Sequence, residues 1–202
     1  MARREARQQR HVIVFARSPE YGRVKSRLAA EIGPLVAWRF YREATARLLR
    51  RLEADPTWTV WLATTGRTRR GWPGGRRWMP QGGGSLATRM ERCLEALPPG
   101  DAVLLGSDIP AVRRNHIRRA FIQLRHAPVV FGPARDGGFW LVGVRRVPGL
   151  PSPLFPRGTR WSSKHTLADV EAGLRVPTGR ADLLRDIDTV EDWQALPKDW
   201  RR

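Results

Sequence analysis

Short apolar runs alternate with helical patterns along this chain, and that alternation limits the fold more than any other feature of the sequence. The runs that predict buried strands are HVIVFA (11–16), WTVWLAT (58–64), the run before Asp108, PVVFG (128–132) and FWLVGV (139–144). Helical patterns lie at 34–54, around Met90, at 113–125, at 163–174 and near the C-terminus. Strands that alternate with helices indicate an α/β protein with a mostly parallel sheet.

Two segments between these patterns are not helical. Asp136, Gly137 and Gly138 stand between two apolar runs and predict a hairpin turn, which adds an antiparallel pair to the parallel core. The Gly- and Arg-rich segment 65–84 is expected to be a loop. A chain of 202 residues is long enough for one substantial core, so we expect a basic, disordered tail at 1–10 and a single domain at 11–202.

The chain is strongly basic, with 37 Lys and Arg against 19 Asp and Glu and a formal charge of +18. This charge suits nucleic acid, anionic membrane surfaces and phosphorylated small molecules. Arginine is spread over every segment, which weakens the inference of a nucleic-acid partner. A non-catalytic nucleic-acid-binding protein stays an alternative, because one predicted helix gathers four arginines: Arg113, Arg114, Arg118 and Arg119. No nucleic-acid-binding motif accompanies them, so we expect no specific nucleic-acid partner.

The expected location is the cytoplasm. Cys93 is a single cysteine within a helical pattern, which is typical of a small buried side chain in a reducing compartment. No apolar stretch reaches the roughly 18 residues that a membrane span needs, so we expect none.

Acidic residues that could bind a ligand stand at two distant places in the sequence. Asp108 comes directly after a buried run, where a carboxylate can serve a turn or a helix cap, or can bind a ligand at the carboxyl edge of a sheet. Asp186 and Asp188 point to the same side if their segment is extended. A capping box, formed by Thr189 with Asp192 or by Asp188 with Glu191, would explain Asp188 but leaves Asp186 unexplained. Carboxylates brought together from distant segments suit a magnesium ion that also binds phosphate oxygens.

The segment after the first strand, RSPEYGRVKSRL, is rich in cations. Gly22 permits a tight turn, and Arg23, Lys25 and Arg27 stand at alternating positions. The segment has neither the Walker spacing nor the dinucleotide-binding spacing. It is therefore interpreted either as a phosphate-binding loop or as a solvated loop.

The motifs FARSPEYGRVKSRL, QGGGSLATRM, GSDIP, GPARDGGFWLVG, RWSS and RDIDTVEDW, in this order, resemble those of a bacterial glycosyltransferase family. That family is named for arsenosugar biosynthesis and belongs with the nucleotide-diphospho-sugar transferases of GT-A type. The resemblance implies a Rossmann-like three-layer αβα sandwich with a nucleotide over the first-strand loop. It also implies a divalent metal, Mg²⁺ or Mn²⁺, held by Asp108 and Asp188.

The resemblance further implies transfer of a sugar from a nucleotide-diphosphate donor to a small-molecule acceptor. Asp108 and Asp136 are the implied catalytic residues, and Asp136 either orients the sugar or acts as a base. The implied nucleotide-binding residues are Ala16, Arg17, Gly22, Lys25, Arg27 and Arg89. The implied substrate-binding residues are Gly137, Gly138 and Phe139. A close alternative is a nucleotidyltransferase that acts on a phosphorylated small molecule and a nucleoside triphosphate.

The sequence departs from the family pattern at a few positions. Arg17 stands where lysine is usual and keeps the charge, and Ser26 replaces threonine and keeps the hydroxyl. Ser85 and Ala87 stand where the pattern has aspartate and glycine, so a carboxylate contact expected there is missing.

Overall fold

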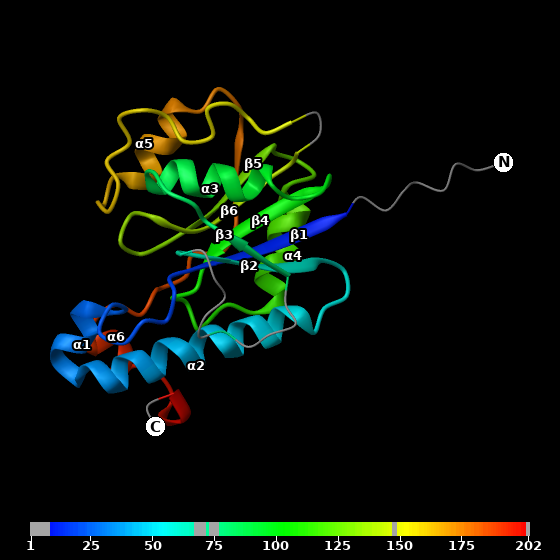
Figure 1. Ribbon diagram of the computed structural model, residues 1–202. Helices are drawn as coiled ribbons and strands as arrows, with labels where there is room; N and C mark the ends of the chain where they lie inside the picture. The colour runs from blue at the N-terminus through cyan, green and yellow to red at the C-terminus, as the bar shows by residue number, and fades with distance from the viewer. Residues whose placement is uncertain (1–8, 67–71, 73–76, 147–148, 201–202) are drawn as a thin grey trace.

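A sheet of seven strands forms the centre of the computed structural model, which describes residues 9–66, 72, 77–146 and 149–200 (Figure 1). The strands are β1 (Arg10–Ala16), β2 (Thr59–Thr64), β3 (Arg77–Pro80), β4 (Asp101–Gly106), β5 (Val129–Pro133), β6 (Phe139–Val144) and β7 (Thr178–Arg180). Their order across the sheet is β3-β2-β1-β4-β6-β5-β7. All except β6 run in the same direction. The predicted α/β fold, mostly parallel with an antiparallel pair, is confirmed.

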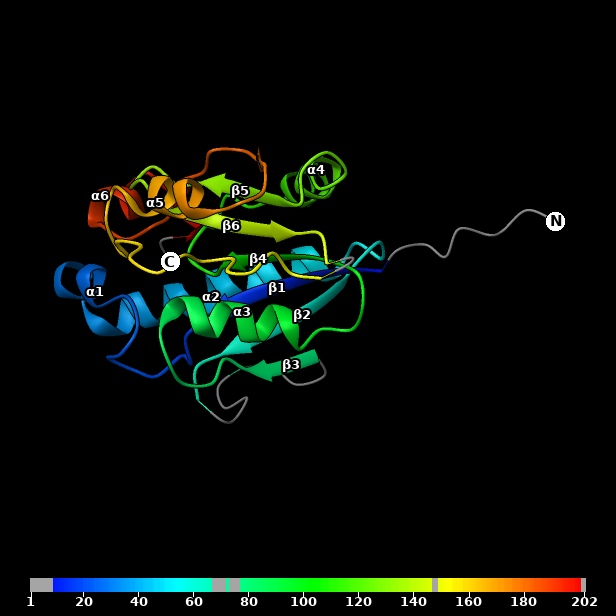
Figure 2. The same cartoon turned by 90° about the horizontal axis from the view of Figure 1, so that it is seen from above.

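Helices cover both faces of this sheet (Figure 2). They are α1 (Ser26–Ile32), α2 (Pro34–Glu53), α3 (Leu86–Glu95), α4 (Arg114–Gln123), α5 (Thr166–Gly173), α6 (Val190–Gln194) and a short 3₁₀ helix (Lys198–Trp200). Helices α2 and α4 pack on one face, and α3 and α5 pack on the other. The result is the Rossmann-like three-layer αβα sandwich that the resemblance implied.

The central strands carry continuous apolar runs, 12–16 in β1 and 102–105 in β4, because both of their faces are buried there. In β1, Val12 and Val14 pack toward α2 and α4, whereas Ile13 packs toward α3 on the opposite face. In β4, Leu105 and Leu104 divide in the same way. Continuous apolar runs are expected for strands covered by helices on both sides.

The hairpin occupies an unexpected position in the sheet. Strand β6 lies between β4 and β5 and pairs antiparallel with both, so the antiparallel strand is central. Its residues are almost all buried, as the apolar run FWLVGV requires. At Gly132 a Cβ atom would lie 2.6 Å from the Trp140 ring, so glycine permits the indole to cover the strand.

Three elements were not predicted from the sequence. Strand β3 lies in the segment 65–84 that was expected to be a loop, of which 67–71 and 73–76 lie outside the described residues. Helix α1 and strand β7 were also missed. The reason is length, because elements of three to seven residues with at most one buried side chain carry little periodicity. Of the predicted tail, 1–8 lies outside the described residues, and Arg10 already begins β1.

The C-terminal segment packs against the first two helices. A separate apolar cluster joins α1, α2 and α6, and it includes Leu28, Phe40, Ile187, Trp193 and Trp200. Figure 1 shows α1 and α6 side by side next to the N-terminal half of α2. This packing brings the chain around residue 187 next to the loop that follows β1.

Two further observations bear on the sequence predictions. Cys93 is buried in α3, and burial raises the pKa of its thiol to about 11. In the part of the chain that the structure describes, no helix combines the length and apolar character that crossing a membrane requires.

Candidate active site

Four chain segments meet at one edge of the sheet. Strands β1, β4, β5 and β7 are parallel, so the segments that follow them emerge at the same edge, which we call the carboxyl edge. These segments are 17–25, 107–110, 134–138 and 181–189. In open α/β sheets this is the edge at which ligands bind.

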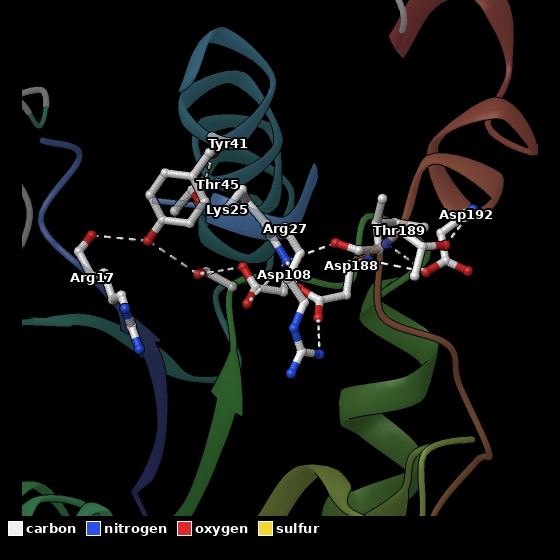
Figure 3. Close-up of polar contacts among 11 residues, drawn as sticks. Arg17, Lys25, Arg27, Tyr41, Thr45, Asp108, Asp188, Thr189 and Asp192 are labelled. Atoms are coloured by element: carbon white, nitrogen blue, oxygen red, sulfur yellow. Dashed lines mark hydrogen bonds and ion pairs between the residues drawn. The ribbon is translucent and has the colours of Figure 1, made fainter. Parts of the chain in front are cut away.

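A lysine lies between the two aspartates that were predicted to hold a metal (Figure 3). The Lys25 Nζ is 3.3 Å from Asp108 Oδ2 and 3.6 Å from Asp188 Oδ1. The Lys25 side chain is only 5% exposed, whereas those of Asp108 and Asp188 are 45% and 36% exposed. The prediction that these distant carboxylates converge therefore agrees with the geometry, and we call Asp108 and Asp188 the carboxylate pair.

The backbone around Lys25 explains how its side chain reaches this position. Lys25 immediately precedes α1 and has left-handed backbone angles, with φ 51° and ψ 44°. Its Nζ also donates a 2.6 Å hydrogen bond to the carbonyl of Ile187, and the Ile187 N–H donates to the carbonyl of Asp108 at 3.1 Å. Lys25 is thus held by three acceptors, and the interpretation of a solvated loop does not apply to it.

Arg27 approaches the same cluster from outside. Its Nη1 lies 3.0 Å from Asp188 Oδ2, and its side chain is 83% exposed. Arg27 projects from the first turn of α1, one residue after Ser26. The carboxylate pair is thus neutralised by one buried and one exposed cation.

Asp192 fixes the backbone that carries Asp188. Its Oδ2 accepts hydrogen bonds from the N–H groups of Asp188 at 3.1 Å and of Thr189 at 3.0 Å. Its Oδ1 forms an ion pair with Arg185. Burial works against ionisation of Asp192, but these N–H groups and Arg185 outweigh it and lower the pKa of the carboxyl group. The predicted capping box of Thr189 with Asp192 is confirmed, and the alternative with Asp188 as the cap is wrong.

A tyrosine of α2, which was not among the predicted site residues, borders Asp108. The Tyr41 hydroxyl donates to the carbonyl of Arg17 at 2.8 Å, and the Ser107 hydroxyl lies 3.4 Å from it and 3.5 Å from Asp108 Oδ1. Burial, and then the charge of Asp108, raise the pKa of Tyr41. A tyrosine in an apolar helical stripe needs a polar partner, which is the one signal that could have marked it.

Gln81 connects two of the predicted nucleotide-binding residues. Its buried amide nitrogen donates to the carbonyls of Ala16 at 2.9 Å and Ala63 at 3.0 Å, and its oxygen accepts from Arg89 at 3.0 Å. Ala16 and Arg89 are therefore brought together at the end of β1. Sequence reasoning missed Gln81, because the strand that it follows, β3, was itself expected to be a loop.

Two further positions that were singled out from the sequence, Gly22 and Ser85, have simple structural roles. Gly22 has φ +74° with open space around it, which fits the predicted turn. Ser85, which departs from the family pattern, accepts the Thr88 N–H at 3.2 Å and caps the N-terminus of α3. The serine thus has a structural role that needs no carboxylate.

The turn between β5 and β6 brings a second group of residues to the carboxyl edge. Asp136 Oδ1 accepts the N–H of Gly138 at 2.9 Å, which supports the turn interpretation of this aspartate. Gly137 has φ +85°, and a Cβ atom there would lie 2.2 Å from the carbonyl oxygen of Lys164. Phe139 contacts an aromatic cluster of Phe131, Phe155 and Trp161.

Asp186 lies near Asp136 of the turn between β5 and β6 and near Asp188 of the C-terminal segment. Burial first, and then the charges of Asp136 and Asp188, raise the pKa of its carboxyl group. The turn between β5 and β6 and the C-terminal acids therefore belong to one electrostatic environment. Asp186, which capping did not explain, is a half-buried member of that environment.

The donor set fits a divalent ion that keeps part of its hydration shell. The carboxylate pair supplies oxygen ligands, and the buried ammonium of Lys25 shows that a cation is accommodated between them. Among the described residues no group of three or more His, Cys, Asp or Glu could hold a metal. The remaining ligands would be water and phosphate oxygens, as is usual for Mg²⁺ bound with a nucleotide.

The four arginines on α4 are engaged within the chain. Arg118 Nε lies 2.9 Å from Asp55 Oδ2, and Arg119 Nε lies 2.9 Å from Asp182 Oδ2. Their neighbours donate to main-chain carbonyls, from Arg113 to Pro110 and from Arg114 to Ala54. These contacts explain the four arginines without a nucleic-acid partner.

This fold is that of the nucleotide-diphospho-sugar transferase superfamily. The chain belongs to the bacterial family DUF2064, described as "Uncharacterized protein conserved in bacteria", which matches residues 47–163. No curated protein matches the sequence.

Solved structures with this fold include three informative cases. A protein assigned to the nucleotide-diphospho-sugar transferases, from Desulfovibrio desulfuricans G20, is 26% identical, with 92% of this chain and 85% of that chain covered and a TM-score of 0.80. Rv0371c from Mycobacterium tuberculosis H37Rv, in complex with manganese, is 18% identical over 94% and 98% of the two chains, with a TM-score of 0.50. The 4-diphosphocytidyl-2C-methyl-D-erythritol synthase from Anaerococcus prevotii DSM 20548 is 11% identical over 97% and 100%, with a TM-score of 0.55. The last two likenesses concern the fold alone.

Proposed function

We propose that this protein is a transferase that uses a nucleotide-diphosphate sugar as donor and binds Mg²⁺ or Mn²⁺ at the carboxylate pair. The observation that carries the proposal is the convergence of Asp108 and Asp188 with Lys25 at the carboxyl edge. The Desulfovibrio protein supports the choice of substrate class, and the manganese complex of Rv0371c supports the use of a divalent metal.

In this proposal each group at the carboxyl edge has a distinct task. The bound metal would neutralise charge that develops on the diphosphate leaving group. Arg27, with its exposed guanidinium, is placed to bind phosphate oxygens, and Lys25 is the second cation proposed to bind them. Arg17 and Gly22 shape the loop beside the phosphates, and Ala16 with Arg89 lies on the nucleotide side.

Asp136 is the proposed group on the acceptor side. One of its oxygens is engaged by Gly138, which fixes the carboxylate and leaves the second oxygen to orient the sugar or to accept a proton from an acceptor hydroxyl. Gly137, Gly138 and Phe139 form the proposed substrate contacts beside it. The proposed acceptor is a small molecule. The family resemblance suggests that this acceptor belongs to arsenosugar biosynthesis.

Nucleotidyl transfer to a phosphorylated small molecule is the alternative, because the same fold occurs in the Anaerococcus synthase. The two reactions release different products. Nucleoside diphosphate indicates sugar transfer, whereas pyrophosphate indicates nucleotidyl transfer.

A ligand screen followed by product analysis tests the proposal. Nucleoside diphosphates, nucleotide sugars and nucleoside triphosphates are compared by thermal shift in Mn²⁺, Mg²⁺ or EDTA. A ligand that binds only the native state adds about 2.7 kcal/mol of stability at 100 times its Kd. A screen without any metal-dependent shift would contradict both forms of transfer.

Asp108→Asn and Asp188→Asn test the metal site directly. Each change removes a charge from the carboxylate pair, so metal-dependent nucleotide affinity should fall by about tenfold or more. The double variant should lose little beyond either single variant, because both residues serve one ion.

Asp182→Asn is the matched control for these variants, because Asp182 lies in the same C-terminal segment but pairs with Arg119. Its metal dependence should be that of the parent protein. If nucleotide binding by Asp108→Asn depended on metal as strongly as in the parent protein, the metal role of Asp108 would be refuted, and Asp108 would be a turn residue.

A further inference from the structure

The buried ammonium of Lys25 stands where a divalent ion would contact the carboxylate pair. It contacts one oxygen of each carboxylate, at 3.3 and 3.6 Å, and is almost fully enclosed. A Mg²⁺ ion requires its oxygen ligands at about 2.0–2.1 Å, so an ion bridging the same oxygens needs the space that the ammonium fills. Lys25 and a bridging ion therefore exclude one another.

The charges lead to the same conclusion. The two carboxylates are balanced by Lys25 and Arg27, each in direct contact with Asp188. A divalent ion added beside an unmoved Lys25 would place like charges a few ångströms apart inside a partly dehydrated cluster, which is strongly unfavourable. Arg27 is mostly exposed, so water and salt screen its charge far better.

Lys25 has an alternative place to go. Its flexible four-carbon stem allows the ammonium to move without the backbone, which is fixed at the start of α1. The loop that carries Lys25 also carries Arg23, and Arg27 follows in the first turn of α1. A diphosphate bound against this loop offers the anionic oxygens that the ammonium loses when it leaves the carboxylates.

We propose that Lys25 is an exchangeable counter-ion. Its ammonium neutralises the carboxylate pair when no metal is bound, and it moves to contact the diphosphate when a divalent ion binds. The inference rests on the proposed function and adds a coupling to it. Lys25 opposes binding of the metal alone, and the metal in turn releases Lys25 for the diphosphate. Metal and diphosphate thus bind together more tightly than either binds alone.

The first test measures binding of Mn²⁺ alone to Lys25→Met, which removes the charge and keeps an unbranched side chain. Mn²⁺ affinity without any phosphate ligand should rise by about tenfold or more, because the competing ammonium is gone. Without metal the variant should unfold at a lower temperature than the parent, because the carboxylates then repel one another. Mn²⁺ should restore more stability to the variant than to the parent.

The second test measures binding of inorganic pyrophosphate, a diphosphate probe without a base, in EDTA and in excess Mn²⁺. Lys25→Met should weaken pyrophosphate binding in Mn²⁺ by about tenfold, and should change it by less than about threefold in EDTA, where the ammonium of the parent is held by the carboxylates. A lysine that bound phosphate permanently would give the same loss in both conditions.

Arg27→Met is the matched control, because it also removes one positive charge that contacts Asp188. It should raise Mn²⁺ affinity by less than about threefold, since the exposed charge is screened, and should weaken pyrophosphate binding alike in EDTA and Mn²⁺.

Two results would overturn the inference while leaving the proposed function intact. The first is an unchanged Mn²⁺ affinity in Lys25→Met. The second is a loss of pyrophosphate affinity in Lys25→Met that is equal with and without metal. Either result counts in this way when the parent protein itself binds nucleotide in the presence of metal. A parent protein that binds neither Mn²⁺ nor pyrophosphate would refute the proposed function as well.

Discussion

Replacing Asp192 by alanine should weaken both the fold and the proposed metal site, because this residue holds the backbone of Asp188. The Asp192 side chain is 8% exposed, and one of its oxygens accepts two main-chain N–H groups at 3.1 and 3.0 Å. Alanine leaves the N–H groups of Asp188 and Thr189 without this acceptor and leaves Arg185 without its ion-pair partner.

The expected loss follows from these contacts. Each N–H group that loses a buried, charged acceptor lowers the free energy of unfolding by about 1–3 kcal/mol. Because water partly reaches Asp188 and Thr189, we expect a total loss of about 3 kcal/mol. Thr189→Ala removes only the reciprocal cap and should cost about 1 kcal/mol. Urea unfolding of the two variants measures this difference.

The metal site provides the second measurement. Asp192→Ala frees the backbone of Asp188, so Mn²⁺ affinity should fall by about tenfold, as is typical when a group that orients a metal ligand is lost. Asp192 has a lowered pKa, so its stabilising contribution is present above the ordinary value of 3.8 and is lost as the pH falls through the folded-state pKa. The stability difference from the parent should therefore shrink in acid. A loss below about 0.5 kcal/mol at pH 7 with unchanged Mn²⁺ affinity would refute this account.

Two further predictions concern the acceptor side of the carboxyl edge. Gly137→Ala should destabilise the protein in urea unfolding by about 3 kcal/mol or more, because its Cβ would meet the backbone of Lys164 at a positive φ. Gly138→Ala, whose nearest neighbour is the movable Asp136 side chain, should cost less than about 1 kcal/mol, and equal losses would contradict the steric reason. Asp186→Asn should raise the melting temperature at pH 7, because burial and Asp136 disfavour the charged carboxylate. The raised pKa means that this penalty is absent below pH 3.8 and grows as the pH rises, so a gain that persists in acid would contradict the cause.

The sequence predicted the layers of this fold well, because buried strands and amphipathic helices carry strong periodic signals. The run FWLVGV was predicted as a strand with its observed bounds, 139–144. Its position in the middle of the sheet was not predictable from the run itself, because strand order depends on pairing between distant segments. Strand β3 was missed because four residues, with Met79 as the buried one, give no measurable alternation.

The candidate site was predictable in its residue types and not in its contacts. Asp108 was selected because it follows a buried strand, and its pairing with Asp188 was implied by the family resemblance. The topology brings the two segments together. The position of Lys25 depends on hydrogen bonds across 162 residues of sequence and on a left-handed backbone that no motif marks. Gln81 escaped notice because its role, to join two strand ends to α3, is visible only once the strands are paired.

The position of Ile187 late in the sequence determines when the proposed metal site can form during synthesis. Its N–H and carbonyl hold Asp108 and Lys25, while its side chain lies in the cluster between α1 and α6. On the ribosome, β1 to β6 are made before this residue, so a nascent chain can contain nearly the whole sheet and still lack half of the carboxylate pair. A chain cut by a protease before residue 186 would be in the same state. In the proposed function, competence to bind metal is therefore acquired late in synthesis, and a cut before residue 186 removes it.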